Sequence, residues 1–178
     1  MNINFDDYLY LFKEMKIPAK TILLREGDVS KKAYFIREGC LRLWFNNNGK
    51  DITVQFFFEN EAVSSVESFR LGTPSLFTLE SIEPSTVLVI TKKNYEMFEN
   101  EVPGYKEYML EVLFRRVAHY SQLFLSRIRD NPQKRYLELL KTHPHIIQRV
   151  PQQYIASYLG ITAVSLSRIR KKTMTNRD

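Results

Sequence analysis

The spacing of hydrophobic residues along the chain changes twice. Phe5, Tyr8, Leu9 and Phe12 recur at helical spacing and predict a short helix over residues 5–15. From about residue 19 to residue 90, apolar and polar residues alternate, which is typical of half-buried strands. A helical period returns after residue 92. The pattern therefore predicts a β-rich first half and a helical second half.

Turn residues divide the alternating half into short strands. These are predicted at residues 21–24, 33–37, 41–45, 52–56, 77–82 and 86–90. The tetrapeptide Asn46-Asn47-Asn48-Gly49 predicts a tight hairpin between the third and fourth of them. Many short strands at close spacing indicate a sandwich or a barrel.

A long amphipathic helix is predicted over about residues 104–129. Its apolar residues step mostly by three and four: Tyr105, Met109, Val112, Val117, Tyr120, Phe124 and Ile128. Further apolar residues beside this stripe widen the surface, namely Leu113, Phe114, Leu123 and Leu125. We interpret the helix as packing on its own β-half and on a second copy of the chain. Burial within a single chain is the alternative.

A new helix is expected after the long one. Asn131 can cap it, Pro132 suits its first turn, and it is expected to end near Thr142. We therefore predict a domain boundary near Asp130, with one domain at residues 1–130, which includes the long helix, and a second at residues 131–178.

Residues 150–172 read as a helix, a glycine turn and a second, basic helix. Ile155 and Leu159 lie four apart on the first helix, and Gly160 can take a left-handed turn. Thr162 offers a hydroxyl as N-cap to the second helix, whose Leu166 is expected to pack inward. This layout predicts a DNA-reading helix-turn-helix. The alternative is an ordinary helical hairpin with a solvated basic face.

Positive charge is concentrated in the same part of the chain. Residues 131–178 hold 9 Lys and Arg against 2 Asp and Glu, whereas residues 1–130 hold 17 against 18. Basic clusters gain affinity for phosphate backbones by releasing counterions. The charge distribution therefore places the expected polyanion-binding surface in the helix-turn-helix segment.

Several site classes are excluded by composition. Cys40 is the only cysteine and no histidine precedes His119, so we expect no disulfide framework, iron–sulfur cluster, haem, metal or other cofactor. Cys40 itself is interpreted as a small packed residue. The first residues lack a basic start followed by an apolar run, and no stretch is long enough to span a membrane. A cytoplasmic protein is expected.

The order of these elements resembles the catabolite-activator and Fnr-type (Crp/Fnr) family of bacterial transcription regulators. In the β-half, the residues that carry the resemblance are Gly27, Tyr34-Phe35-Ile36, Gly39 and Arg42. In the C-terminal part they are Gln153, Ile155-Ala156, Leu159-Gly160, Thr162, Ser165, Leu166 and Arg168. The resemblance implies an α+β fold: a double-stranded β-helix (a cupin-like jelly roll, or β-roll) similar to cyclic nucleotide-binding domains, a dimerisation helix and a winged-helix-like helix-turn-helix.

The same resemblance implies which residues contact double-stranded DNA. Ser165 and Arg168 match positions that contact phosphate or base, and a guanidinium can bind guanine O6 and N7. The full expected set is Thr162, Ser165, Ser167, Arg168, Lys171, Lys172, Gln152 and Gln153. Ala163 and Val164 stand where family members that read guanine-rich half-sites carry Arg and Glu. A different operator is therefore expected.

The ligand-binding pattern of the family is only partly present. Cyclic-nucleotide-binding members pair a Gly-Glu with a later Arg-Ser, whose arginine holds the cyclic phosphate. Here Ser75 remains, Pro74 occupies the place of the arginine, and the Gly-Glu is absent. We expect weak or no cyclic AMP binding. The candidate pocket for an unknown small-molecule effector comprises Ser64, Ser65, Arg70, Ser75 and Ser121.

The leading hypothesis is a homodimeric, sequence-specific DNA-binding transcription regulator, with RNA polymerase as a further partner and no membrane partner. The second is a ligand-binding or protein-interaction module whose DNA-binding domain has degenerated, which Ala163 and Val164 favour. An enzyme is the third and is poorly supported. Ser64, Ser65 and Glu67 have no histidine nearby in sequence, and no second positioned carboxylate is identifiable there to form a catalytic pair.

Overall fold

The computed structural model describes the backbone of residues 5–175 and the side chains of residues 7–173. It divides into two compact units. The first unit comprises Met1–Phe45 and Phe56–Arg116, and the second comprises Asn46–Gln55 and Val117–Asp178. This division differs from the expected boundary near Asp130, because it falls within the long helix and assigns the hairpin tip to the helical unit. The assignment of functions to residues 1–130 and 131–178 stays a prediction.

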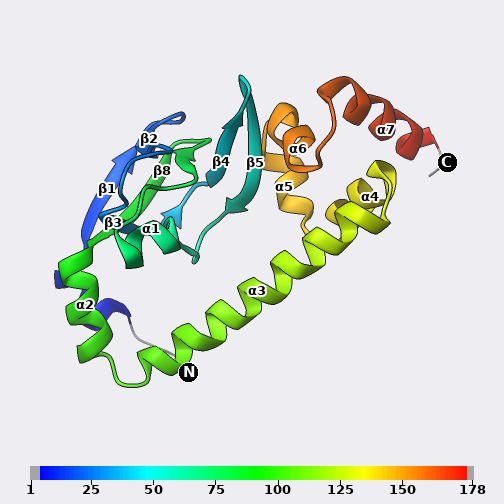
Figure 1. Ribbon diagram of the computed structural model, residues 1–178. Helices are drawn as coiled ribbons and strands as arrows, with labels where there is room; N and C mark the ends of the chain where they lie inside the picture. The colour runs from blue at the N-terminus through cyan, green and yellow to red at the C-terminus, as the bar shows by residue number, and fades with distance from the viewer. Residues whose placement is uncertain (1–4, 176–178) are drawn as a thin grey trace. The chain divides into compact units, whose positions relative to one another are not determined.

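Within residues 5–175, eight strands form two four-stranded antiparallel sheets, which make up a β-roll (Figure 1). One sheet has the order β1-β8-β3-β6 and the other β2-β7-β4-β5. The strands are β1 (Lys13–Ile17), β2 (Ile22–Leu24), β3 (Lys32–Glu38), β4 (Leu41–Asn47), β5 (Lys50–Phe57), β6 (Ala62–Val63), β7 (Thr78–Ser81) and β8 (Ser85–Thr91). All six predicted strands are confirmed, with small differences at their ends, whereas β1 and β6 were not predicted.

The predicted helix over residues 5–15 is wrong in its second half. A 3₁₀ helix, η1 (Phe5–Leu11), ends before strand β1 begins at Lys13. Strand β1 pairs with β8, with Met15 opposite Val87. Its partner lies more than seventy residues away in the sequence, so the local helical spacing could not reveal the pairing.

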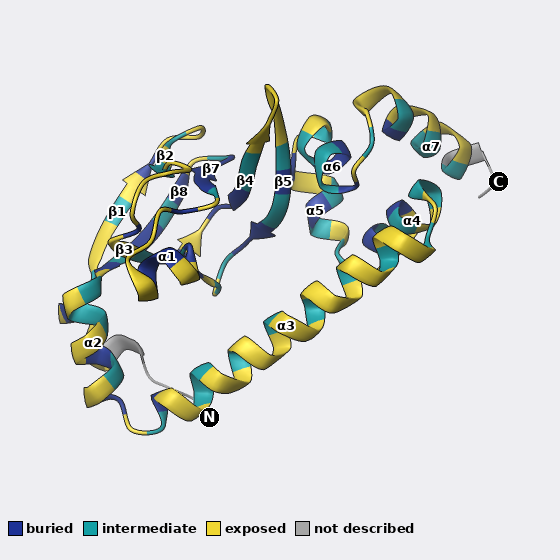
Figure 2. Cartoon of the chain, in the orientation of Figure 1, coloured by how far each residue is buried: buried dark blue, intermediate teal, exposed yellow. Residues whose placement is uncertain are grey.

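The alternating residues of the strands build the core of the β-roll, as the burial colours in Figure 2 show. The buried members are Ile17, Tyr34, Ile36, Leu41, Leu43, Phe57, Val63, Leu79 and Val87. Alternation places Arg42 on the opposite face from Leu41 and Leu43, yet Arg42 is only 2% exposed. Strand β4 is therefore covered on both faces at this point.

The hairpin between β4 and β5 turns as predicted. Asn48 and Gly49 both have positive φ, 51° and 82°, as a two-residue type I′ turn requires. The backbone N–H of Gly49 donates to Oδ1 of Asn46 at 2.9 Å. The conformation is consequently specified by local sequence.

Two short helices and the start of the long helix complete the first unit. They are α1 (Val66–Leu71), which was not predicted, α2 (Lys92–Glu101) and the first residues of α3 (Tyr105–Arg129). Tyr105 is buried against Phe98, with ring centroids 4.9 Å apart. The inclusion of Tyr105 in a stripe facing a second copy is therefore wrong, because its own unit covers it.

The second unit is mainly helical. After α3 come α4 (Pro132–Thr142), α5 (Pro144–Arg149), α6 (Gln152–Tyr158) and α7 (Ala163–Thr175). Oδ1 of Asn131 accepts the backbone N–H of Lys134 at 2.9 Å, which confirms the predicted cap of α4. Every regular element described between residues 131 and 175 is a helix, so this range supplies no strands for the wing of the expected winged-helix-like arrangement.

Candidate DNA-binding surface and effector region

Helices α6 and α7 are joined by the glycine turn that the sequence predicts. Gly160 has a φ of 68°, and its N–H donates to the carbonyl of Ser157 at 3.0 Å. The N–H of Ile161 donates to the carbonyl of Ala156 at 2.9 Å. These two bonds form a Schellman motif, which ends α6 and reverses the chain direction.

Thr162 then starts α7. Its Oγ1 accepts the backbone N–H of Ser165 at 3.1 Å and lies 3.0 Å from Oγ of the same serine. The predicted N-cap is confirmed. The two hydroxyls thus hydrogen-bond to each other. Any contact that they make to DNA must therefore form while they also cap α7.

The two helices pack through small and aliphatic residues. Ile155, Ala156, Leu159 and Leu166 are buried, and Leu166 has no exposed surface. Ala156 allows close approach of the two backbones because its side chain is a single methyl group. The predicted inward face is therefore confirmed.

The opposite face of α7 is exposed and basic. Val164, Ser167, Arg168, Lys171 and Lys172 are all exposed and recur at helical spacing. The structure thus brings together four of the eight predicted DNA contacts: Ser167, Arg168, Lys171 and Lys172. Val164 adds an apolar surface that could touch a thymine methyl but cannot hydrogen-bond a base edge.

Two more of the predicted contacts lie at the start of α6, whereas Thr162 and Ser165 lie at the start of α7. Gln153 is exposed and Gln152 is half-buried in its first turn. Amide side chains at this position can donate to phosphate oxygens and so position a protein on DNA without reading sequence.

The C-terminal end of α6 is held by two guanidinium groups that sequence reasoning missed. Nη2 of Arg127, on α3, donates to the carbonyl of Tyr158 at 3.0 Å. Nη2 of Arg135, on α4, donates to the carbonyl of Leu159 at 2.9 Å. Cations at a helix C-terminus complement its partial negative charge. No local signal could reveal these caps, because each arginine lies more than twenty residues from its acceptor.

A charged group stabilises the junction between α3 and α4. Asp130 forms ion pairs with Arg129 at 3.1 Å and Lys134 at 2.8 Å. Hydrogen bonds from these two cations lower the pKa of the Asp130 carboxyl to about 2. Asp130 is therefore ionised at neutral pH.

In the first unit, the structure brings two of the predicted effector residues together. Oγ of Ser75 lies 2.9 Å from Oγ of Ser65 and 2.7 Å from the carbonyl of Phe77. Both serines are buried, while Ser64 is half-buried. The two hydroxyls thus hydrogen-bond to each other. In a phosphate-binding site they would instead point toward the ligand.

The other predicted effector residues lie elsewhere. Arg70 has an exposed side chain, pairs with Glu99 at 3.3 Å and lies over the ring of Tyr95. It is therefore not a buried cation poised for a phosphate. Ser121 belongs to the second unit, and its hydroxyl donates to the carbonyl of Val117 at 3.0 Å within α3.

The loop that carries Pro74 is closed by backbone bonds. The N–H of Gly27 donates to the carbonyl of Ser75, and the N–H of Ser75 donates to the carbonyl of Asp28, both at 2.8 Å. Oγ of Ser68 accepts the backbone N–H of Ser30 at 2.8 Å. These polar groups are therefore satisfied from within the chain.

The described part of the chain holds neither a candidate metal cluster nor a candidate membrane span. No group of three or more His, Cys, Asp or Glu residues there is placed to hold a metal ion. None of the helices described is both long enough and apolar enough to cross a membrane.

Comparison with known proteins gives one family match. Residues 14–100 match the cyclic nucleotide-binding domain family. This range contains all eight strands except the first residue of β1, together with helices α1 and most of α2. No curated protein sequence matches the chain.

Solved structures of Crp/Fnr regulators share the fold. A CooA mutant from Carboxydothermus hydrogenoformans superposes with a TM-score of 0.77 at 16% identity, covering 98% of this chain and 81% of that one. CLP of Xanthomonas campestris, described as a c-di-GMP-responsive global regulator, gives 0.77 at 16% identity, with coverage of 97% and 91%. FixK2 of Bradyrhizobium japonicum gives 0.78 at 15% identity, with coverage of 93% and 85%.

Proposed function

We propose that this protein is a sequence-specific DNA-binding transcription regulator of the Crp/Fnr type. The observation that carries the proposal is the exposed basic face of α7. A glycine turn joins this helix to α6, and a threonine caps its first turn. A helix with this face fits a major groove, where Arg168 can read guanine and Lys171 and Lys172 can bind phosphates. Residues 131–178 are the proposed DNA-binding domain.

Homodimerisation through α3 is part of the proposal. Leu110, Phe114, Val117, Phe124 and Ile128 are all more than 60% exposed. With Ser121 they recur at alternating steps of four and three, which is the seam of a two-helix coiled coil. We call these six residues the α3 seam. It differs from the stripe expected from sequence and shares only Val117, Phe124 and Ile128 with it.

A dimer would present two copies of α7 to successive major grooves. Recognition helices about 34 Å apart read a pseudo-palindromic site. Residues 1–130 would then supply the sensing and pairing functions, and RNA polymerase would be a further partner in the cytoplasm.

The β-roll is proposed to sense an effector other than cyclic AMP bound in the usual way. Pro74 cannot supply a cation, and Ser65 and Ser75 hydrogen-bond each other. We propose no catalytic role for the chain. The solved structures with the same fold described above are regulators.

The proposal is tested by selecting duplexes from a random-sequence library with the purified protein. We expect enrichment of a pseudo-palindromic motif and a gel-shift preference for it over random duplex at moderate salt. The second candidate, a module with a degenerate DNA-binding domain, is favoured by the side chains of Ala163 and Val164. That candidate gains support if binding is steeply salt-dependent but shows no sequence preference.

A further inference from the structure

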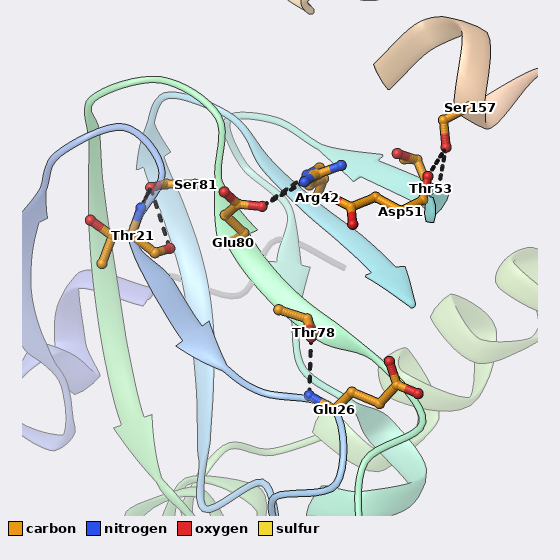
Figure 3. A network of polar contacts seen from close by, with 9 residues as sticks. All are labelled: Thr21, Glu26, Arg42, Asp51, Thr53, Thr78, Glu80, Ser81 and Ser157. Carbon is orange, nitrogen blue, oxygen red and sulfur yellow. Dashed lines mark hydrogen bonds and ion pairs between the residues drawn. The ribbon is translucent and has the colours of Figure 1, made fainter. Parts of the chain in front are cut away.

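A single serine joins the edge of strand β5 to the first helix of the helix-turn-helix. Oγ of Ser157, on α6, accepts the backbone N–H of Thr53 at 2.8 Å and donates to the backbone carbonyl of Asp51 at 2.6 Å. Figure 3 shows the three residues together, with the hydroxyl facing the strand. All three belong to the second compact unit.

The contact completes an otherwise open sheet edge. Strand β5 is the last strand in the order β2-β7-β4-β5, so one side of its backbone has no neighbouring strand. The N–H of Thr53 and the carbonyl of Asp51 point to the same side because side direction repeats every second residue. The Ser157 hydroxyl therefore takes the place that an adjoining strand would occupy.

A hydroxyl can satisfy both backbone groups at once. It has one proton to donate and lone pairs to accept, whereas Ala has neither. Thr53 has no exposed surface, so loss of the serine oxygen leaves a buried N–H without this acceptor. A serine at position 157 therefore suits a contact that needs one donor and one acceptor.

The hairpin and α6 have further ties within the same unit. The Tyr120 hydroxyl, on α3, donates to Oε1 of Gln55 at 2.5 Å, two residues beyond Thr53 on β5. The residues that follow Ser157 are held by the arginines of α3 and α4 described above. Ser157, Tyr158 and the C-cap residue Leu159 are consequently fixed to three different elements.

We propose that Ser157 is a positioning residue for DNA reading, which sets the placement of α6, and through it α7, on the β4–β5 hairpin. The inference rests on the proposed function and extends it to how the hairpin takes part. Because α6 is already held in one place, less conformational entropy is lost when α6 and α7 bind DNA.

The first test replaces the hydroxyl. Ser157→Ala is compared with Ser157→Thr, which keeps the hydroxyl, and with Ser126→Ala. The Ser126 hydroxyl bonds only to the Leu123 carbonyl of its own helix in the described contacts, so it is the matched control. The probe is the duplex enriched by the wild-type protein from a random library. We expect about tenfold weaker binding for Ser157→Ala, near wild-type binding for Ser157→Thr, and no change for the control.

A second measurement reports the contact itself, whether or not DNA is bound. Amide hydrogen exchange at Thr53 should be faster in Ser157→Ala than in wild type or Ser157→Thr, with the helices of the second unit still protected. Loss of protection throughout Ser157→Ala would indicate that this variant unfolds. The positioning role of Ser157 would then be tested with Ser157→Thr and with the hairpin variant described next.

The hairpin variant is Gly49→Ala. Gly49 has a φ of 82° and open space around its position, so an added methyl group strains only the turn. We expect Gly49→Ala to weaken DNA binding severalfold when Ser157 is present and to have no additional effect in the Ser157→Ala background.

The outcomes distinguish failure of the proposed function from failure of the positioning role of Ser157. If no duplex is enriched, the proposed function fails, and exchange at Thr53 still tests the contact. If a duplex is enriched but Ser157→Ala binds it as well as or better than wild type, the positioning role is overturned. Additive effects of Gly49→Ala and Ser157→Ala overturn the role of the hairpin.

Discussion

Arg42 and Glu80 form a buried ion pair in the β-roll, with Nη2 and Nε of Arg42 lying 2.8 Å and 3.0 Å from the same Oε2 of Glu80 (Figure 3). The two residues stand directly opposite each other on β4 and β7. The guanidinium carbon also lies 4.9 Å from the centre of the Trp44 ring. A buried charge of this kind depends on its partner, because burial removes the water that would otherwise solvate it.

Removing one partner should therefore destabilise the protein. Glu80→Gln removes the negative charge that pairs with the buried Arg42, and we expect the free energy of unfolding to fall by about 3–5 kcal/mol in urea denaturation. Glu99→Gln, which breaks the partly exposed pair with Arg70, is the control and should cost no more than about 1 kcal/mol. Equal small losses for both variants would contradict a dominant role for burial.

The α3 seam predicts the effect of a charge at its centre. Val117→Asp should convert a dimer into a monomer in analytical ultracentrifugation, because a coiled-coil interface buries this position. Arg115→Asp alters a neighbouring exposed residue outside the seam and should leave the dimer intact. A wild-type protein that sediments as a monomer at tens of micromolar would refute the pairing.

Two basic residues of α7 should affect DNA binding in different ways. Arg168→Ala is expected to cost about 1–3 kcal/mol on the selected duplex and to relax specificity at one base pair. Lys171→Ala should weaken binding to all duplexes alike and reduce the slope of log K against log salt by about 1. Lys106→Ala, an exposed change on α3, is the control. The assignment of base and phosphate roles is wrong if the two variants behave identically.

Cyclic AMP binding should be absent or weak. Pro74 supplies no cation, and Ser75 bonds to Ser65 and to the Phe77 carbonyl, so the cyclic phosphate has no charged anchor. Isothermal titration calorimetry is expected to show no submicromolar affinity, and Ser75→Ala should not change that result. A submicromolar dissociation constant for the wild-type protein would overturn this expectation.

Asp130 predicts a pH dependence of stability at low pH. Its pKa is lowered from 3.8 to about 2 by hydrogen bonds from Arg129 and Lys134. A carboxyl whose folded pKa is lowered stabilises the fold fully above its unfolded value, and that contribution disappears as pH falls from about 4 toward 2. Unfolding measured against pH should show this loss in wild type and a smaller one in Asp130→Asn. An Asp130 carboxyl that titrates at 3.8 in the folded protein by NMR would contradict the prediction.

Elements governed by neighbouring residues were predictable from sequence. The Asn48-Gly49 turn, the Asn131 and Thr162 caps and the Gly160 reversal all rest on contacts within a few residues. The length of α3 likewise follows from an uninterrupted helical period. In these cases backbone preference and short-range hydrogen bonding decide the conformation, so the local sequence contains the needed information.

The sequence by itself therefore determined a half made of many short strands, followed by a long helix and a basic helix pair, because those features depend on hydrophobic period, turn chemistry and charge. The tertiary structure alone decided three others. It made Lys13–Ile17 a strand by pairing it with β8, buried Arg42 by placing Glu80 opposite, and joined Ser157 to Thr53 across more than a hundred residues. Each depends on a partner that is distant in the chain, and only folding brings such groups within hydrogen-bonding distance.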